Sequence, residues 1–179
     1  KIDGSNASFQ YDRETDSVIC FSRNQILSPE LHLRGFYEWV QKLDKERVHA
    51  VLGDNLRMFG EWLVRHTVPY PKDCYETLYC FDVFDMEQHR YLPQDQVKAL
   101  AEQLGLRYVP VFYEGPFTSW EDYQPLVGKT ELGGEIGEGI IIKNLSTLSG
   151  TLAYTKIVHE NFSENKKTWK KKQRRKPSP

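Results

Sequence analysis

The chain has 179 residues, 39% of them hydrophobic and 13% aromatic, which is enough to build one hydrophobic core and excludes an intrinsically disordered protein. No apolar run approaches the ~20 residues that cross a bilayer, and no secretory signal pattern opens the sequence, so we expect a cytoplasmic protein with no membrane partner. The three cysteines and five histidines show no metal-binding spacing, which argues against a zinc site.

The net charge of −1 conceals an uneven distribution of charged residues. Residues 165–179 carry eight of the 24 Lys and Arg residues and no acid, which leaves 16 basic against 25 acidic residues elsewhere. We therefore expect a domain at residues 1–164 followed by a basic tail at residues 165–179. Eight cations around Trp169 suit contact with a nucleic-acid backbone. The alternatives are a solvated charged tail or a nuclear-localisation signal, which would make the protein nuclear.

The first half of the chain contains strand patterns on both sides of a helix pattern. Short β-rich runs predict strands at Ala7–Tyr11 and Val18–Phe21, joined by a polar turn. Ser28 followed by proline has helix-start chemistry, and apolar residues at helical spacing extend the predicted helix to about Lys45. Two further apolar runs predict strands at 48–52 and 56–64.

The second half continues with alternating elements. Thr77–Phe84 is rich in β-formers and predicts a buried strand, whereas Pro93–Leu104 has a helical apolar face that ends at a glycine. The remaining predicted elements are a strand at 107–113, a short helix at 119–126 and strands at 139–142 and 152–158. Strands outnumber helices and most connections are short, which predicts an α+β fold of twisted antiparallel sheets flanked by helices.

Five short sequence motifs contain charged residues and lie in or next to predicted strands. They are K-I-D-G-S-N at 1–6, F-G-E-W-L at 59–63, F-D-V-F-D at 81–85, E-G-I-I-I-K at 138–143, and Lys156. Each element alone is a weak signal, but their order resembles the covalent nucleotidyltransferase superfamily of ATP-dependent DNA and RNA ligases and mRNA-capping enzymes. The resemblance implies an ATP-grasp-like nucleotidyltransferase domain. Because the chain starts inside the first motif, we expect the domain to be cropped at its N-terminus.

The resemblance also implies a role for each charged residue. Lys1 would be the nucleophile that becomes covalently bound to AMP, an instance of amine covalent catalysis. Lys143 and Lys156 would be catalytic cations that stabilise charge on the α-phosphate of ATP. Asp3 and Glu138 would hold a hydrated Mg²⁺ ion, with Mn²⁺ as an alternative.

Within the superfamily, two segments resemble the ATP-dependent RNA ligases of the RNA ligase 2 type. Asn6 belongs to a G-S-N extension of the first motif, and Arg23 lies in the S-R-N segment after the second strand. The alternative roles are a turn residue for Asn6 and a surface charge for Arg23. Glu61 would bind the ribose and Phe84 would stack on adenine, whereas Phe81 would be a core residue. The implied ATP-binding set is therefore Asn6, Arg23, Glu61, Phe84, Glu138, Lys143 and Lys156.

The sequence therefore predicts an ATP-dependent RNA ligase that seals RNA ends in nicked duplexes or broken RNA, with DNA ends as a further substrate class. One departure concerns the last motif, because Val158 stands where many ligases have a second lysine. The alternatives are a DNA ligase, a capping-type nucleotidyltransferase, or a non-catalytic nucleic-acid-binding module that retains the fold.

Overall fold

The computed structural model describes residues 1–133, 137–144 and 153–159. The predicted basic tail at 165–179 and the first residue of the last predicted strand, Leu152, lie outside the described residues. Helices and a mostly antiparallel sheet confirm the predicted α+β class. None of the helices in the described ranges is long and apolar enough to span a membrane.

The main sheet contains six strands, and all but one of its pairings are antiparallel. The hydrogen-bonded order is β2-β1-β3-β4-β5, and β6 pairs in parallel with β4. The strand bounds are Ser5–Asp12 for β1, Ser17–Ser22 for β2, Leu56–Leu63 for β3, Thr77–Asp85 for β4, Arg90–Tyr91 for β5 and Arg107–Tyr108 for β6. A register shift between Phe59 and Gly60 of β3 leaves Phe81 of β4 without a directly paired residue.

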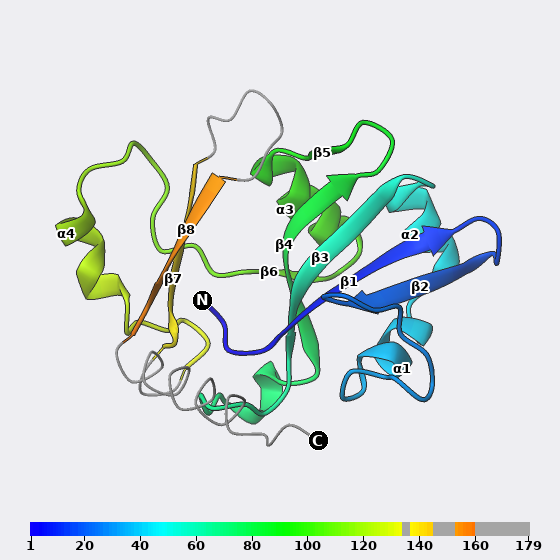
Figure 1. Ribbon diagram of the computed structural model, residues 1–179, viewed down its shortest axis with the longest axis horizontal. Coiled ribbons are helices and arrows are strands. Elements are labelled where there is room, and N and C mark those ends of the chain that lie inside the picture. The colour runs from blue at the N-terminus through cyan, green and yellow to red at the C-terminus, as the bar shows by residue number, and fades with distance from the viewer. Residues whose placement is uncertain (134–136, 145–152, 160–179) are drawn as a thin grey trace, which may run out of the picture.

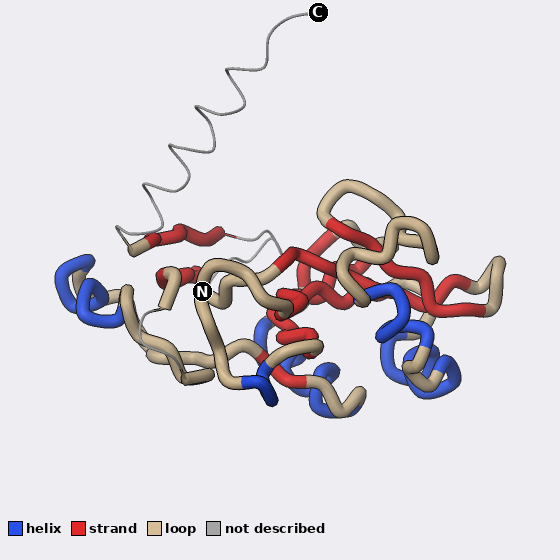
Figure 2. The backbone as a smooth tube through the Cα atoms, turned by 90° about the horizontal axis from the view of Figure 1, so that it is seen from below, coloured by secondary structure: helices blue, strands red, loops and turns tan. Residues whose placement is uncertain are grey.

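Three helices cover one face of this sheet and enclose the largest core (Figure 2). They are α1 at Phe36–Gln41, α2 at Lys45–Leu52 and α3 at Gln94–Gln103. The strands contribute Phe9, Met58 and Trp62, each at most 1% exposed. Because side chains alternate across a strand, the residues between these core positions point to the opposite face of the sheet.

A second, two-stranded sheet lies beside the main sheet, and the N-terminal residues run between the two (Figure 1). Its strands are β7 at Gly139–Asn144 and β8 at Ala153–Val158. The short helix α4 at Trp120–Tyr123 and the 3-10 turn η2 at Gln124–Leu126 pack against β7 through an apolar cluster. Another 3-10 turn, η1 at Lys72–Cys74, lies near the N-terminal segment.

The predicted helix from Ser28 to Lys45 is wrong over its first part. Only Phe36–Gln41 is helical, because Leu33, Arg34 and Gly35 all have positive φ angles (48°, 52° and 92°). Three successive left-handed residues cannot belong to a right-handed helix. Regular apolar spacing in this segment therefore accompanies a loop that packs on the core.

The predicted strand at 48–52 is also wrong, because these residues form the end of α2. Val48 and Leu52, four residues apart, are both buried, as expected for one face of a helix. The Asp44 side chain accepts hydrogen bonds from the amides of Glu46 and Arg47 and so caps the helix. A cap that precedes the apolar run therefore decided its local structure.

The other predicted elements hold with changed bounds. The strand predicted at 107–113 is only two residues long, since Pro110 has no amide hydrogen to continue the ladder. The helix predicted at 119–126 exists as α4 and η2, with the Ser119 hydroxyl accepting from the amide of Asp122. β7 extends two residues beyond the strand predicted at 139–142.

Candidate active site

The side chain of Lys1 lies against β7 at the junction of the two sheets. Its Nζ atom donates to Oε2 of Glu138 at 2.5 Å, and its backbone nitrogen donates to the carbonyl of Gly139 at 2.6 Å. Both side chains are largely buried, with 16% of Lys1 and 8% of Glu138 exposed. The first and fourth motifs of the sequence therefore meet as an ion pair.

The two motif glycines are explained by close backbone contacts. A Cβ atom on Gly4 would lie 2.5 Å from the carbonyl oxygen of Trp62, and one on Gly139 would lie 2.1 Å from that of Ile157. Neither distance is compatible with a side chain, so the D-G and E-G dipeptides are sterically required. They allow the segment after Lys1 to approach β3, and β7 to approach β8.

Glu61 on β3 lies in the same junction. It is paired with Asn6 of β1 in the sheet register, and its Oε1 atom accepts from the amide of Gly4 at 3.2 Å. Burial raises the pKa of Glu61 from 4.5 to about 7, and the negative charge of Glu138 acts in the same direction. Lys1 and Lys156 lower this pKa, so both ammonium groups are close enough to act on the Glu61 carboxyl group.

Asp3 is held by the loop that follows β3. Its Oδ2 atom accepts from the amide of Val68 at 2.8 Å, and its own amide donates to the Tyr70 hydroxyl at 3.0 Å. Its Oδ1 atom makes no hydrogen bond with another described residue. Asp3 and Glu138 supply the hard oxygen donors that Mg²⁺ and Mn²⁺ prefer, and Mg²⁺ needs only one or two carboxylates because it keeps several waters. The described residues contain no group of three or more His, Cys, Asp or Glu side chains that could hold a metal ion.

Lys143 does not join the Lys1–Glu138 pair. Its Nζ atom donates to the Phe81 carbonyl at 2.9 Å, to Oδ1 of Asp82 at 2.8 Å and to Oε1 of Gln94 at 3.3 Å. Gln94 in turn donates to Asp82 at 3.0 Å and accepts from the Tyr108 hydroxyl. All three ammonium hydrogens therefore have acceptors, and this network connects β7 to β4 and α3.

The two phenylalanines of the third motif have different surroundings. The Phe84 ring packs on Tyr91 of β5 at 5.0 Å and on His89 at 6.4 Å, near the end of β4. The Phe81 ring lies 5.5 Å from Nζ of Lys143, only two residues from Tyr79, the β4 partner of Glu61. Both rings are partly exposed. The structure thus brings Phe81, which the sequence assigned to the core, nearer to the charged residues than Phe84.

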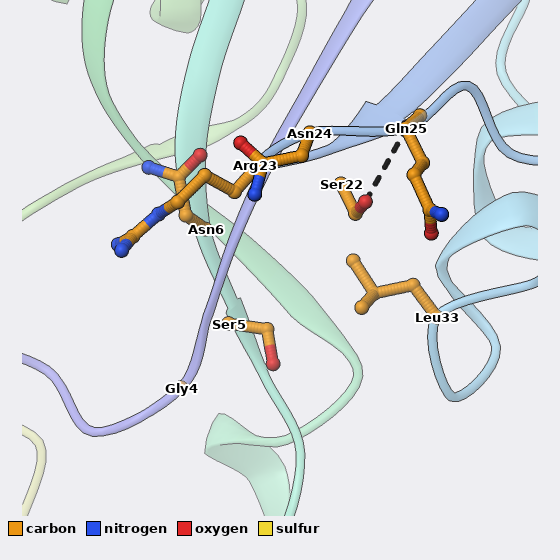
Figure 3. Close-up of a pocket in the computed structure, with 8 residues that line it drawn as sticks. All are labelled: Gly4, Ser5, Asn6, Ser22, Arg23, Asn24, Gln25 and Leu33. Atoms are coloured by element: carbon orange, nitrogen blue, oxygen red, sulfur yellow. Dashed lines mark hydrogen bonds between the residues drawn. The ribbon is translucent and has the colours of Figure 1, made fainter.

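Asn6 and Arg23 line a pocket of about 670 Å³ next to the Lys1 segment (Figure 3). Residues 4–6 form one wall and the turn at residues 22–25 forms another, with Leu33 completing the lining. The side chains of Arg23 and Asn6 project to the same side of this pocket, away from Leu33. Because Asn6 is paired with Glu61, the pocket lies next to the strand position of Glu61.

The last motif lies on β8. Lys156 is exposed, faces Ile141 across the two-stranded sheet, and has its Nζ atom 5.6 Å from the Tyr154 ring. Val158 is partly buried and pairs with Gly139. Lys156 is the single lysine of β8, and its positive charge lowers the pKa of Glu61.

Asp82 and Gln94 are the site residues that sequence reasoning missed. Asp82 is only 4% exposed and stands in the F-D motif, so that motif was a usable signal for a buried charge with a partner. Gln94 had no such signal, because its contact with Lys143 joins residues 49 positions apart.

Solved structures of RNA ligases have a fold similar to that of this chain. The structure of a Naegleria gruberi RNA ligase with PPi matches with a TM-score of 0.66 and 19% identity, covering 94% of this chain and 50% of that one. A point mutant of that ligase with ATP and Mn has a TM-score of 0.69 and 20% identity over 93% and 50% of the two chains. An archaeal ATP-dependent RNA ligase has a TM-score of 0.67 and 18% identity over 94% and 44%.

The chain spans about half the length of these solved proteins. A search of curated proteins found no match. The family model described as RNA ligase matches residues 1–171, and the chain belongs to this family. This confirms the RNA ligase family, which the motifs and the segments that contain Asn6 and Arg23 predicted by resemblance.

Proposed function

We propose that the chain is the nucleotidyltransferase domain of an ATP-dependent RNA ligase and that Lys1 is the residue that receives AMP. The observation that carries the proposal is the buried pair between Nζ of Lys1 and Oε2 of Glu138, 2.5 Å apart. Glu61, whose pKa is affected by the charges of Lys1, Glu138 and Lys156, adds a second carboxyl group, and Lys156 adds a second cation. Attack on a nucleoside triphosphate requires an amine nucleophile, carboxylates that can accept its proton, and a cation that stabilises the phosphate charge. This group of side chains contains all three.

The first step would be nucleophilic displacement at the α-phosphate of ATP. The Lys1 ammonium must lose a proton to attack, and the Glu138 carboxylate is its nearest acceptor. The amine electron pair forms a P–N bond, and the bond from the α-phosphorus to the bridging oxygen of the β-phosphate breaks. Pyrophosphate leaves with that electron pair, and Lys156 would stabilise the negative charge on the phosphates.

ATP and a divalent ion bind in solved relatives, and we extend both to this chain as part of the proposal. Asp3 and Glu138 would hold the ion, Mg²⁺ or Mn²⁺, which when bound would neutralise phosphate charge and act as a Lewis acid. Glu61 would hydrogen-bond the ribose, and Asn6 and Arg23 would contribute from the adjoining pocket. Phe81 and Phe84 are both candidates for stacking on adenine, and the position of Phe81 next to Lys143 favours it.

Two further transfers would complete RNA sealing. A 5′-phosphate oxygen would attack the AMP phosphorus, break the P–N bond and return the amine to Lys1. A 3′-hydroxyl would then attack the activated 5′-phosphate, form the phosphodiester and release AMP. The partners are RNA ends in nicked duplexes or broken strands, with DNA ends as a further class, and the basic segment 165–179 would add phosphate contacts.

Intact-protein mass spectrometry after incubation with ATP and Mg²⁺ or Mn²⁺ tests the proposal. We expect a species heavier by one AMP, which survives denaturation and maps to Lys1. Lys1→Arg should abolish it, whereas Lys98→Arg, an exposed change on α3, should not. Labelling that persists in Lys1→Arg would refute the assignment of the nucleophile. Stronger labelling from GTP than from ATP would favour a capping-type enzyme, and no labelling with either nucleotide would favour a non-catalytic module.

A further inference from the structure

Four aromatic side chains contact one another around α4. This helix lies at the edge of the molecule in Figure 1. Three of the four side chains are large and exposed: Tyr113 (47%), Phe117 (56%) and Trp120 (48%). The Phe117 ring lies 5.0 Å from that of Trp120 and 5.6 Å from that of the buried Tyr123, which also contacts Tyr113 at 5.6 Å. We name these four residues the aromatic patch. Exposed aromatic clusters of this kind mark interaction surfaces.

The charge around the aromatic patch is negative. Glu114, Glu121 and Asp122 are exposed and form no ion pair with another described residue. No Lys or Arg occurs between Arg107 and Lys129. A polynucleotide needs cations for its phosphates, so this surface is unsuited to RNA. Carboxylates beside exposed ring faces suit a segment rich in Lys and Arg, since ammonium and guanidinium groups bind both.

The described part of the chain ends near the aromatic patch, and a segment rich in Lys and Arg follows it in the sequence. His159 is the last described residue, and its amide donates to the Glu138 carbonyl at 2.8 Å. Its ring lies 3.6 Å from the position of a Cβ atom on Gly128, two residues after η2. Since η2 directly follows α4, the described chain ends beside the element that carries the patch.

The length and the charge of the chain after His159 identify the segment that fits the aromatic patch. The six residues 160–165 can span about 20 Å when extended, whereas the seven residues from Trp120 to Leu126 rise only about 10–14 Å as helix. The sequence that follows, residues 166–176, contains eight Lys and Arg residues and no acid. We propose that the aromatic patch and its three carboxylates form the docking surface for the basic segment 165–179 of the same chain.

The docking would have a direct consequence for RNA binding. Cations that contact Glu114, Glu121 and Asp122 are not available to phosphates, so RNA and the aromatic patch compete for the same segment. The docking itself is an interaction within the protein and requires no nucleotide. It can therefore be tested independently of self-adenylylation, and either proposal can fail alone.

Zero-length carbodiimide cross-linking of the 179-residue protein, read by mass spectrometry, tests the contact. This reagent joins a carboxylate to a lysine amine only where the two touch. We expect links from Glu121 or Asp122 to lysines in the range 166–176, with a yield that falls as salt is raised. Links spread evenly over exposed acids elsewhere, such as Glu30 and Glu87, would overturn the proposal.

Two matched double variants test whether the exposed aromatic rings contribute to the docking. Phe117→Ala with Trp120→Ala removes two exposed rings but keeps every carboxylate, whereas Ile26→Ala with Leu31→Ala removes exposed apolar side chains elsewhere (59% and 44% exposed). We expect the first pair to lose most of the cross-link and the second to keep it, with unchanged circular dichroism in both. Equal yields in the two pairs would refute a docking role for the patch.

Two controls identify the occupant. Mixing isotope-labelled and unlabelled protein before cross-linking should give links within one copy only, and a substantial yield of mixed links would transfer the site to a second copy. Ultraviolet cross-linking of a short oligoribonucleotide should miss Phe117 and Trp120. An RNA adduct on either ring would assign the surface to RNA and overturn the proposal.

Discussion

Nζ of Lys1 lies 2.5 Å from Oε2 of Glu138, although the two residues are 137 positions apart in the chain. The contact places the first residue of one motif on the first residue of another, at the start of β7. Only 8% of the Glu138 side chain is exposed, so its charge depends on Lys1 and on any cation bound nearby. Glu138 is therefore the residue whose change most directly tests the proposed site.

Glu138→Gln should keep the hydrogen bond to Lys1 but remove the negative charge. We expect the divalent-metal concentration needed for half-maximal self-adenylylation to rise by about 10–100-fold, as for other residues that support metal sites. Titration with Mn²⁺ and Mg²⁺ measures this, and Glu102→Gln on the exposed side of α3 is the control. If Glu138→Gln and the unchanged protein need the same metal concentration, Glu138 does not bind the metal ion.

Glu61 should make stability depend on pH. Its pKa is raised to about 7 by burial, so the folded protein holds a proton there that the unfolded chain loses near pH 4.5. The favourable contribution is complete below pH 4.5 and is lost as pH rises through 7, a change on the order of 3 kcal/mol. Urea unfolding at pH 4.5 and pH 8 should therefore show a smaller loss of stability for Glu61→Gln than for the unchanged protein. If Glu61→Gln and Glu102→Gln lose stability equally over this range, the Glu61 carboxyl is not buried as described.

The Lys143–Asp82 pair should matter for stability more than an exposed pair does. Lys143→Met leaves the Asp82 carboxylate, 6% exposed, without its cation and should cost about 3–5 kcal/mol in the free energy of unfolding. Lys45→Met is the matched change at an exposed pair, where Lys45 lies 3.1 Å from Asp16, and should cost about 1 kcal/mol or less. Combining Lys143→Met with Asp82→Asn should recover part of the loss. Equal costs for the two lysine changes would show that the buried pair contributes little.

The adenine contact should distinguish the two phenylalanines of β4. Loss of a ring that stacks on a base costs ~1–3 kcal/mol, so Phe81→Ala should raise the apparent dissociation constant for ATP by about 5–150-fold. Phe84→Ala should raise it less, because that ring packs on Tyr91 and His89. Isothermal titration with each variant provides the comparison. The opposite ranking would return adenine stacking to Phe84, as the motif resemblance predicted.

Local sequence patterns were sufficient for most of the strands and for the family. Short runs rich in β-forming or apolar residues marked β1 to β4, and two motif glycines stand where a side chain would meet a carbonyl oxygen. The order of the motifs predicted the nucleotidyltransferase superfamily, and the segments that contain Asn6 and Arg23 predicted the RNA ligases within it, since both signals are visible without a structure. These features depend on residues a few positions apart, where propensity and steric demands act directly.

Contacts between residues far apart in the chain could be identified only from the tertiary structure. Residues 48–52 read as a strand by composition, yet capping by Asp44 and burial against the main sheet make them helical. By resemblance Lys143 was assigned to the α-phosphate of ATP, and only the packing of β7 beside β4 shows that Asp82 and Gln94 accept hydrogen bonds from it. Side-chain partners 49 to 137 positions apart have no local signature, because the free energy of such contacts exists only once the sheets have packed.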